Sequence, residues 1–150
     1  MQSIQENIIV DLILQNTKKI HLIEGLGGFE KIKDFALSIN PVEAPLIWLV
    51  AQDNQNVSFL TVDPFLIFSQ YQPEFGEKDL DILNIQSAED MLVLCMANIV
   101  KKPTIGLTIN LKAPLVINWV TGVGKQFIIV NNHEYSMEHR LLPKKMSEAA

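Results

Sequence analysis

The sequence predicts a mainly β fold, a small antiparallel β-barrel or sandwich-like domain with a short acidic helical insertion. Runs rich in Ile and Val recur about every ten residues and are separated by Asn, Asp, Gly and Pro, which is typical of strands joined by tight turns. No helical pattern of about 10–15 residues separates these runs, as a parallel sheet would require. With 150 residues, of which 48% are hydrophobic and 19% charged, the chain can bury a substantial core.

Nine apolar runs in which Ile and Val recur are predicted as strands, because turn-forming residues bound them. Two glycine clusters are predicted as turns: residues 25–28 follow a strand, and residues 121–125 form the turn of a hairpin between Ile117 and Ile128. The predicted strands are residues 8–14, 19–23, 34–39, 46–51, 57–62, 91–100, 104–111, 115–118 and 126–130.

The net charge of −5 is concentrated in one segment, residues 74–90, which holds six acids and one Lys. The rest of the chain carries eleven acids and eleven bases and is neutral. Because nucleic-acid binding depends on basic surfaces, this balance disfavours direct contact with nucleic acid. The six acids are Glu74, Glu77, Asp79, Asp81, Glu89 and Asp90.

A helix is predicted at residues 77–83, because Leu80 and Leu83 lie three apart and can face the body of the protein. Glu77, Asp79 and Asp81 then face solvent. Ser87 followed by Asp90 resembles a capping box and predicts a further helical turn. We therefore expect the acidic segment to project from the sheet as a helical insertion.

The sequence offers little for catalysis or for metal and cofactor binding. The single cysteine, Cys95, lies in an apolar run and is interpreted as a small buried hydrophobe, so no intrachain disulfide is possible. The three histidines lack metal-ligand spacing, and residues 121–125 lack the glycine and hydroxyl residue of a phosphate-binding loop. We expect no cofactor, no metal and no membrane-spanning segment, and a location in the reducing cytoplasm.

An aromatic segment precedes the acidic one, with Phe65, Phe68 and Tyr71 falling within seven residues. All three can belong to the core, or one large apolar side chain can remain near the surface. An aromatic anchor beside an acidic rim is the composition of a surface that binds a basic protein. The predicted partner-binding residues are Phe65, Phe68, Tyr71, Glu74, Glu77, Asp79 and Asp81.

Four segments, taken together and in order, resemble the flagellar assembly factor FliW family. They are residues 25–30 (GLGGFE), 62–68 (VDPFLIF), 83–94 (LNIQSAEDMLVL) and 109–118 (INLKAPLVIN). The resemblance implies a non-enzymatic protein that binds the RNA-binding translational regulator CsrA, relieves its repression of flagellin translation, and also binds flagellin. It implies either that the acids cover the RNA-binding surface of CsrA or that they act from an adjoining site, and it favours the second slightly.

A function from another class remains open, a small-molecule-binding β-barrel or minor enzyme that uses polar groups inside the barrel. The candidate groups are Asn110, Lys112 and Asn118. For either function we predict one β-rich domain at residues 1–142 and a flexible tail at residues 143–150, where the sequence is polar and without apolar periodicity.

Overall fold

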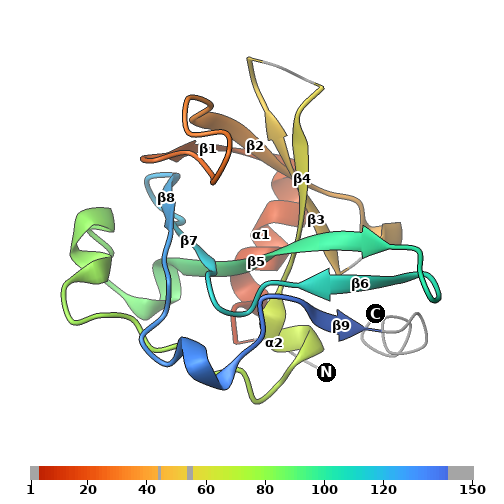
Figure 1. Cartoon of the computed structure of the whole chain (residues 1–150). Coiled ribbons are helices and arrows are strands. Elements are labelled where there is room, and N and C mark those ends of the chain that lie inside the picture. Colours follow the sequence, from red (N-terminus) through yellow and green to blue (C-terminus); the bar gives the residue numbers. More distant parts are fainter. Residues whose placement is uncertain (1–3, 44, 54–55, 142–150) are drawn as a thin grey trace.

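Seven strands of the protein close into a barrel, and two more extend it at one side (Figure 1). The computed structural model describes residues 4–43, 45–53 and 56–141. The barrel strands are β1 (Thr17–Leu22), β2 (Asp34–Ile39), β3 (Leu46–Ala51), β4 (Ser58–Val62), β5 (Met91–Val100), β7 (Leu115–Asn118) and β8 (Val123–Gln126), and the extension holds β6 (Gly106–Ile109) and β9 (His139–Leu141). The helices are α1 (Glu6–Gln15), α2 (Pro64–Ile67) and the short 3-10 turns η1 (Pro41–Glu43), η2 (Asp79–Leu83), η3 (Ala88–Asp90) and η4 (Asn132–Glu134).

The prediction of a mainly β fold is confirmed, and all pairs but one among the described strands are antiparallel. The exception is the short parallel pair of β1 and β8, which places His21 opposite Val123. Alternation along β5 separates two apolar clusters: Leu92 and Leu94 pack with α1, whereas Val93 and Cys95 face the opposite side. No helix among the described residues is long and apolar enough to cross a membrane.

The barrel is closed by a short pairing between β4 and β5. Val62 is the last residue of β4 in this ladder and lies opposite Cys95. There the chain turns into α2, because the Asp63 side chain accepts the N–H of Phe65 at 3.0 Å and Pro64 occupies the first helical position. Between Met91 and Leu94, none of the described strands pairs with β5 on the β4 side.

The prediction of a strand at residues 8–14 is wrong, because this segment lies within the helix α1. Its Ile and Val content is typical of a strand, yet the buried residues Ile8 and Leu12 are four apart and so share one helical face. Packing of this face against the barrel overrides the weak local preference for a strand.

Three further differences concern strand positions. The last barrel strand, β8, begins at Val123 rather than at Gln126, because the hairpin turn comes earlier and ends at Gly122, whose φ is +78°. Beyond β8, the N–H groups of Phe127 and Ile129 still donate to the loop before β7, at 3.0 and 3.1 Å, without forming a regular strand. The strand β9 was not predicted, since it has only three residues.

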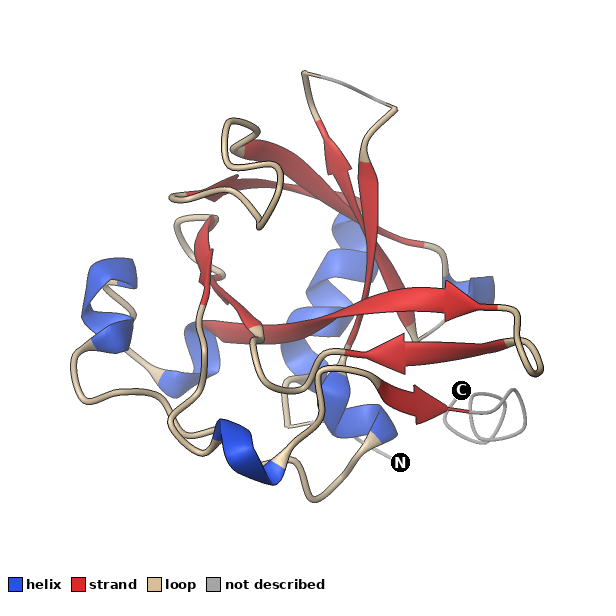
Figure 2. Cartoon of the chain, in the orientation of Figure 1, coloured by secondary structure: helices blue, strands red, loops and turns tan. Residues whose placement is uncertain are grey.

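The acidic insertion is helical at both predicted places, but the helix expected at residues 77–83 is the shorter 3-10 turn η2, and the turn expected after Ser87 is the 3-10 turn η3. Figure 2 shows these short helical pieces beside the barrel. Leu83 is buried, and the Ser87 hydroxyl accepts the N–H of Glu89 at 3.3 Å, as a capping residue does. The tail predicted at residues 143–150 lies outside the described residues, so the domain division stays a prediction.

Candidate protein-binding site

The predicted aromatic residues form one cluster with two residues from the C-terminal part of the chain. Tyr71 lies between the rings of Phe65 and Tyr135, with centroid distances of 5.8 and 4.9 Å. Phe68 meets Tyr135 and His139 edge to face, at 6.2 and 5.5 Å. Such edge-to-face pairs stabilise a packed cluster beyond their burial alone. The cluster thus joins α2 to the last strand of the fold.

The structure decides between the two alternatives that the sequence left open for the aromatic residues, core or surface. Phe65 and Tyr71 are 8% and 2% exposed, and Phe68 is half-buried. The segment forms a short helix and a loop, because Asp63 and Pro64 start α2. Phe65 and Tyr71 therefore lie mostly beneath the protein surface, and their contact with a partner protein stays a prediction.

A pocket of about 470 Å³ opens at this cluster, and we call it the apolar pocket. Phe65 and Tyr71 line it together with Phe75, Met91 and Val93. An open pocket of this size accepts a bulky apolar side chain of a partner. Its remaining lining residues are Ile4, Gln5, Gln72, Pro73, Ala88 and Glu89.

The predicted acids divide into exposed residues and one with a structural role. Glu74, Glu77 and Asp81 are exposed. Asp79 is half-buried, and its carboxylate accepts the N–H of Gly76 at 2.8 Å, which fixes the start of η2. The exposed carboxylates therefore remain available to a basic partner, whereas Asp79 shapes the loop that carries them.

Asn131 holds the acidic loop against the barrel. Its side-chain oxygen accepts the N–H of Glu74 at 2.8 Å, and its amide nitrogen donates to the carbonyl of Gln72 at 2.9 Å. The N–H of Val130 donates to the Glu74 carbonyl at 2.6 Å, and the N–H of Gln72 donates to the Tyr135 hydroxyl at 2.9 Å. These bonds fix the backbone of Glu74 next to the apolar pocket.

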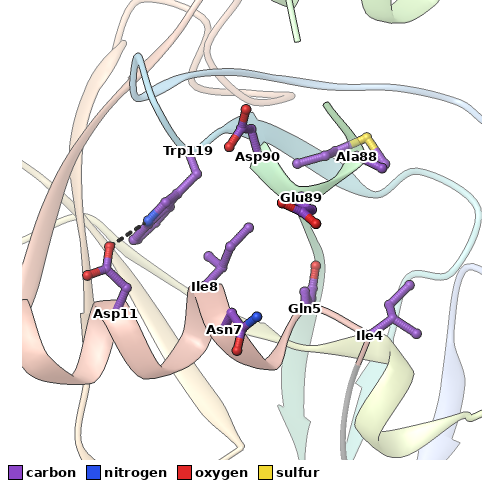
Figure 3. Close-up of a pocket in the computed structure, with 10 residues that line it drawn as sticks. Ile4, Gln5, Asn7, Ile8, Asp11, Ala88, Glu89, Asp90 and Trp119 are labelled. Carbon is purple, nitrogen blue, oxygen red and sulfur yellow. Dashed lines mark hydrogen bonds between the residues drawn. The ribbon is translucent and has the colours of Figure 1, made fainter. Parts of the chain in front are cut away.

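A second pocket, of about 340 Å³, lies between α1 and η3, and we call it the acidic pocket (Figure 3). Asp11, Glu89 and Asp90 line it, with the Trp119 indole along one side. The indole N–H donates to the Asp11 carboxylate at 2.8 Å. This hydrogen bond is the main reason that the pKa of Asp11 lies below its usual value. Asp11 is therefore a carboxylate at neutral pH.

Burial keeps the titratable groups of the cluster protonated at neutral pH. Burial raises the pKa of the Cys95 thiol from 9.0 to about 12, and burial is likewise the main cause of the raised pKa of Tyr71. The Tyr71 hydroxyl donates to the carbonyl of Leu111 at 2.7 Å. A thiol that stays protonated is a poor nucleophile. Among the described residues, no three His, Cys, Asp or Glu side chains gather in a way that could hold a metal ion.

Two of the three polar residues nominated for a small-molecule site, Asn110 and Asn118, hold nearby backbone groups. Asn118 donates to the carbonyl of Leu83 at 2.9 Å and accepts the N–H of Val120 at 2.9 Å. The Asn110 side chain accepts the N–H of Lys112 at 3.0 Å. Neither the apolar nor the acidic pocket is lined by Asn110, Lys112 or Asn118.

Sequence reasoning missed four residues that build the site: Gln5, Phe75, Asn131 and Tyr135. Asn131 belongs to an Asn-Asn pair that reads as a turn, and Tyr135 is the only tyrosine besides Tyr71. Neither feature of the sequence shows which residue the side chain contacts in the fold; Asn131, for example, binds Glu74, which lies 57 residues away in the chain. For Gln5, in the poorly patterned N-terminal segment, no local signal exists.

Comparison with known proteins supports the resemblance seen in the sequence. The family model described as "FliW protein" matches residues 3–141. The "Flagellar assembly factor FliW" of Thermosipho africanus is 33% identical over 118 residues, which is 79% of this chain and 81% of that protein. The protein of the same name from Thermotoga neapolitana is 34% identical over 126 residues, covering 84% and 83% of the two chains.

The fold agrees as well. A structure titled "Crystal structure of the flagellar assembly factor FliW" superposes with a TM-score of 0.72 and 30% sequence identity, covering 83% of this chain and 86% of that one. The family model spans nearly the whole described chain, and the relatives match over most of their own length. The chain therefore belongs to the FliW family.

Proposed function

We propose that this protein is a non-enzymatic flagellar assembly factor that binds a CsrA-type RNA-binding regulator and flagellin. Membership of the FliW family supports the role in flagellar assembly, since the relatives carry that name. Binding of the regulator relieves its repression of flagellin translation, and flagellin competes for this protein. Because translation takes place in the cytoplasm, the proposal includes a cytoplasmic location.

The observation that carries the proposal is an apolar pocket bordered by exposed acids, with Glu89 in its lining and Glu74 between the lining residues Pro73 and Phe75. Glu74, Glu77 and Asp81 are exposed, and the backbone of Glu74 is held next to Pro73 and Phe75, which line the apolar pocket. Apolar burial in a pocket supplies affinity, and like charges on the same surface steer an oppositely charged partner. An RNA-binding regulator is basic where it meets phosphate, so it has the complementary charge.

Binding to an adjoining basic element, which lowers RNA affinity at a distance, is the mechanism that we favour. Such coupling is reciprocal, so RNA must lower the affinity of the regulator for this protein by the same factor. RNA is titrated against a fluorescently labelled complex of this protein with the regulator. A persistent ternary complex at saturating RNA supports the allosteric mechanism, whereas complete displacement shows that the two bind one surface.

Calorimetry with the purified regulator and with purified flagellin tests the proposal itself. We expect a complex of micromolar or tighter affinity that weakens as salt is added, because exposed charges are screened. If neither protein binds at low salt, the proposed function is wrong.

Charge reversal tests the residues. Glu77→Lys and Asp81→Lys should each weaken the complex by up to about fivefold, because exposed ion pairs contribute up to about 1 kcal/mol. Glu43→Lys on η1 is the matched control, an exposed acid that lines neither pocket, and it should leave affinity nearly unchanged. Asp79 is left intact, since its loss would disturb the Gly76 turn. Equal effects at all three positions would place the binding surface elsewhere.

A further inference from the structure

The Gln5 side chain forms hydrogen bonds with the edge of β5 that a neighbouring strand would otherwise form. Val93 lies on the stretch of β5 that β4 leaves unpaired. Its N–H donates to the Gln5 side-chain oxygen at 2.8 Å, and its carbonyl accepts from the Gln5 amide nitrogen at 2.7 Å. A neighbouring strand would make this same pair of bonds with a residue at the edge of a sheet. Gln5 is 5% exposed, so the bonds are shielded from water.

Gln5 also separates the two pockets. The apolar and the acidic pocket lie on either side of the segment that contains Ile4 and Gln5, and both residues line both pockets. Figure 3 shows Gln5 between α1 and the η3 segment that carries Glu89. Displacement of Ile4 and Gln5 would therefore join two pockets of about 340 and 470 Å³ into one groove along the edge of β5.

The lining of this groove selects the chemistry of an occupant. Asp11, Glu89 and Asp90 line the acidic side, and the described lining of the two pockets contains no Lys or Arg. Phe65, Phe75 and other apolar residues line the opposite side. An occupant with alternating apolar and cationic side chains matches both sides, because successive side chains of an extended chain point in opposite directions.

We propose that the edge of β5 at Met91–Val93 is a docking groove for an extended, lysine- or arginine-rich segment of a partner protein, and that Gln5 is an internal occupant which this segment displaces. The incoming strand takes over both bonds of the Val93 backbone, as in other cases of strand addition to a sheet edge. The inference rests on the proposed function, since Phe65 and Tyr71 are predicted partner-binding residues and also line the apolar side of this groove.

The test uses a synthetic peptide as the probe, capped Lys-Val-Lys-Phe-Lys-Val-Lys, and the full-length protein. Affinity is measured by calorimetry, and protection of the Val93 amide by hydrogen exchange. The Gln5→Ala protein should bind the peptide about tenfold more tightly than the unaltered protein, because no internal bonds have to be broken first. The Val93 amide should exchange faster in the Gln5→Ala protein and become protected when the peptide is added.

Two control peptides separate strand pairing from charge attraction. A peptide with Glu in place of each Lys should not bind, because it meets the carboxylates of the groove. A peptide with N-methylated backbone nitrogens keeps its charge but cannot donate to the Val93 carbonyl, and its affinity should fall at least about tenfold. Circular dichroism confirms that each variant is folded. If Gln5→Ala does not fold, Gln5→Glu, which keeps only the acceptor, should give a smaller gain.

Three results would overturn the proposal: equal affinity of the unaltered and Gln5→Ala proteins, undiminished binding of the N-methylated peptide, or no binding of the lysine peptide at millimolar concentration. The experiment contains neither the regulator nor flagellin. A failure of the proposed function would appear instead as the absence of complexes with those two proteins. The two inferences can therefore fail separately.

Discussion

The clamp formed by Asn131 links the stability of the protein to its binding surface, and Asn131→Ala tests this link. Asn131 is 5% exposed and holds the backbone of Gln72 and of Glu74 through one hydrogen bond each, at 2.9 and 2.8 Å. Each such bond contributes about 0.5–1.5 kcal/mol net. Loss of both predicts a decrease of about 2 kcal/mol in the free energy of unfolding, because the backbone groups of the loop lose their partners.

Urea denaturation followed by circular dichroism measures this decrease. With a slope of about 2 kcal/mol per molar urea, the midpoint should fall by about 1 M. Hydrogen exchange should localise the effect, with the Glu74 amide exchanging about thirtyfold faster if the loop opens alone.

Asn132→Ala is the matched control, since this neighbouring side chain makes one bond, to the carbonyl of Ile129 at 2.9 Å. Asn132→Ala should lower the free energy of unfolding by about half as much as Asn131→Ala and should leave the exchange rate of the Glu74 amide unchanged. The reasoning is refuted if Asn131→Ala costs less than about 0.5 kcal/mol and the exchange of Glu74 is unchanged.

Two further predictions concern the core and the first loop. Because burial raises the pKa of Cys95 from 9.0 to about 12, the contribution of the protonated thiol to stability is fully present well below pH 9 and is lost as pH rises toward 12, with a slope that approaches about 1.4 kcal/mol per pH unit. Between pH 9 and 10 the free energy of unfolding should therefore fall by about 1 kcal/mol, and this decrease should be absent in Cys95→Ala. Above pH 10 the raised pKa of Tyr71 adds to the decrease. Gly25 has a φ of +64°, and an added Cβ would lie 2.8 Å from the Phe29 carbonyl oxygen. Gly25→Ala should therefore lower the free energy of unfolding, measured by urea denaturation, by about 1–3 kcal/mol. Gly27→Ala is the control, since Gly27 has open space around it, and it should change this free energy by no more than about 0.5 kcal/mol.

The elements that sequence reasoning predicted well carry their own local signal. Residues 34–39 and 46–51 alternate buried and less buried side chains between turns, and they form β2 and β3 with the predicted bounds. The segment at residues 8–14 failed because its β-branched composition favours a strand, whereas contacts of Ile8 and Leu12 with the barrel favour a helix. The composition of a segment indicates only its local preference for strand or helix, and in residues 8–14 packing against distant strands outweighs that preference.

The candidate site was predicted only in part. The acids at Glu77 and Asp81 are exposed as expected, since charged residues in an insertion have little reason to be buried. The burial of Phe65 and Tyr71 was open at the sequence level, because it depends on contacts with distant residues such as Tyr135, whose ring packs on Tyr71. The ring contact between Tyr71 and Tyr135 joins residues far apart in the chain, and no local pattern predicts such a contact.

By itself, the sequence determined the class of fold, the family and the place of the charge, because periodicity, turn chemistry and acidic residues act over a few neighbouring positions. Only the tertiary structure decided which pockets and which strand edge lie near the acidic residues. The pairing of Gln5 with Val93 spans 88 residues, and it exists because β4 turns away into α2 and leaves one edge of β5 unpaired. Backbone groups at a buried edge require partners, and the side chain that supplies them depends on the path of the whole chain.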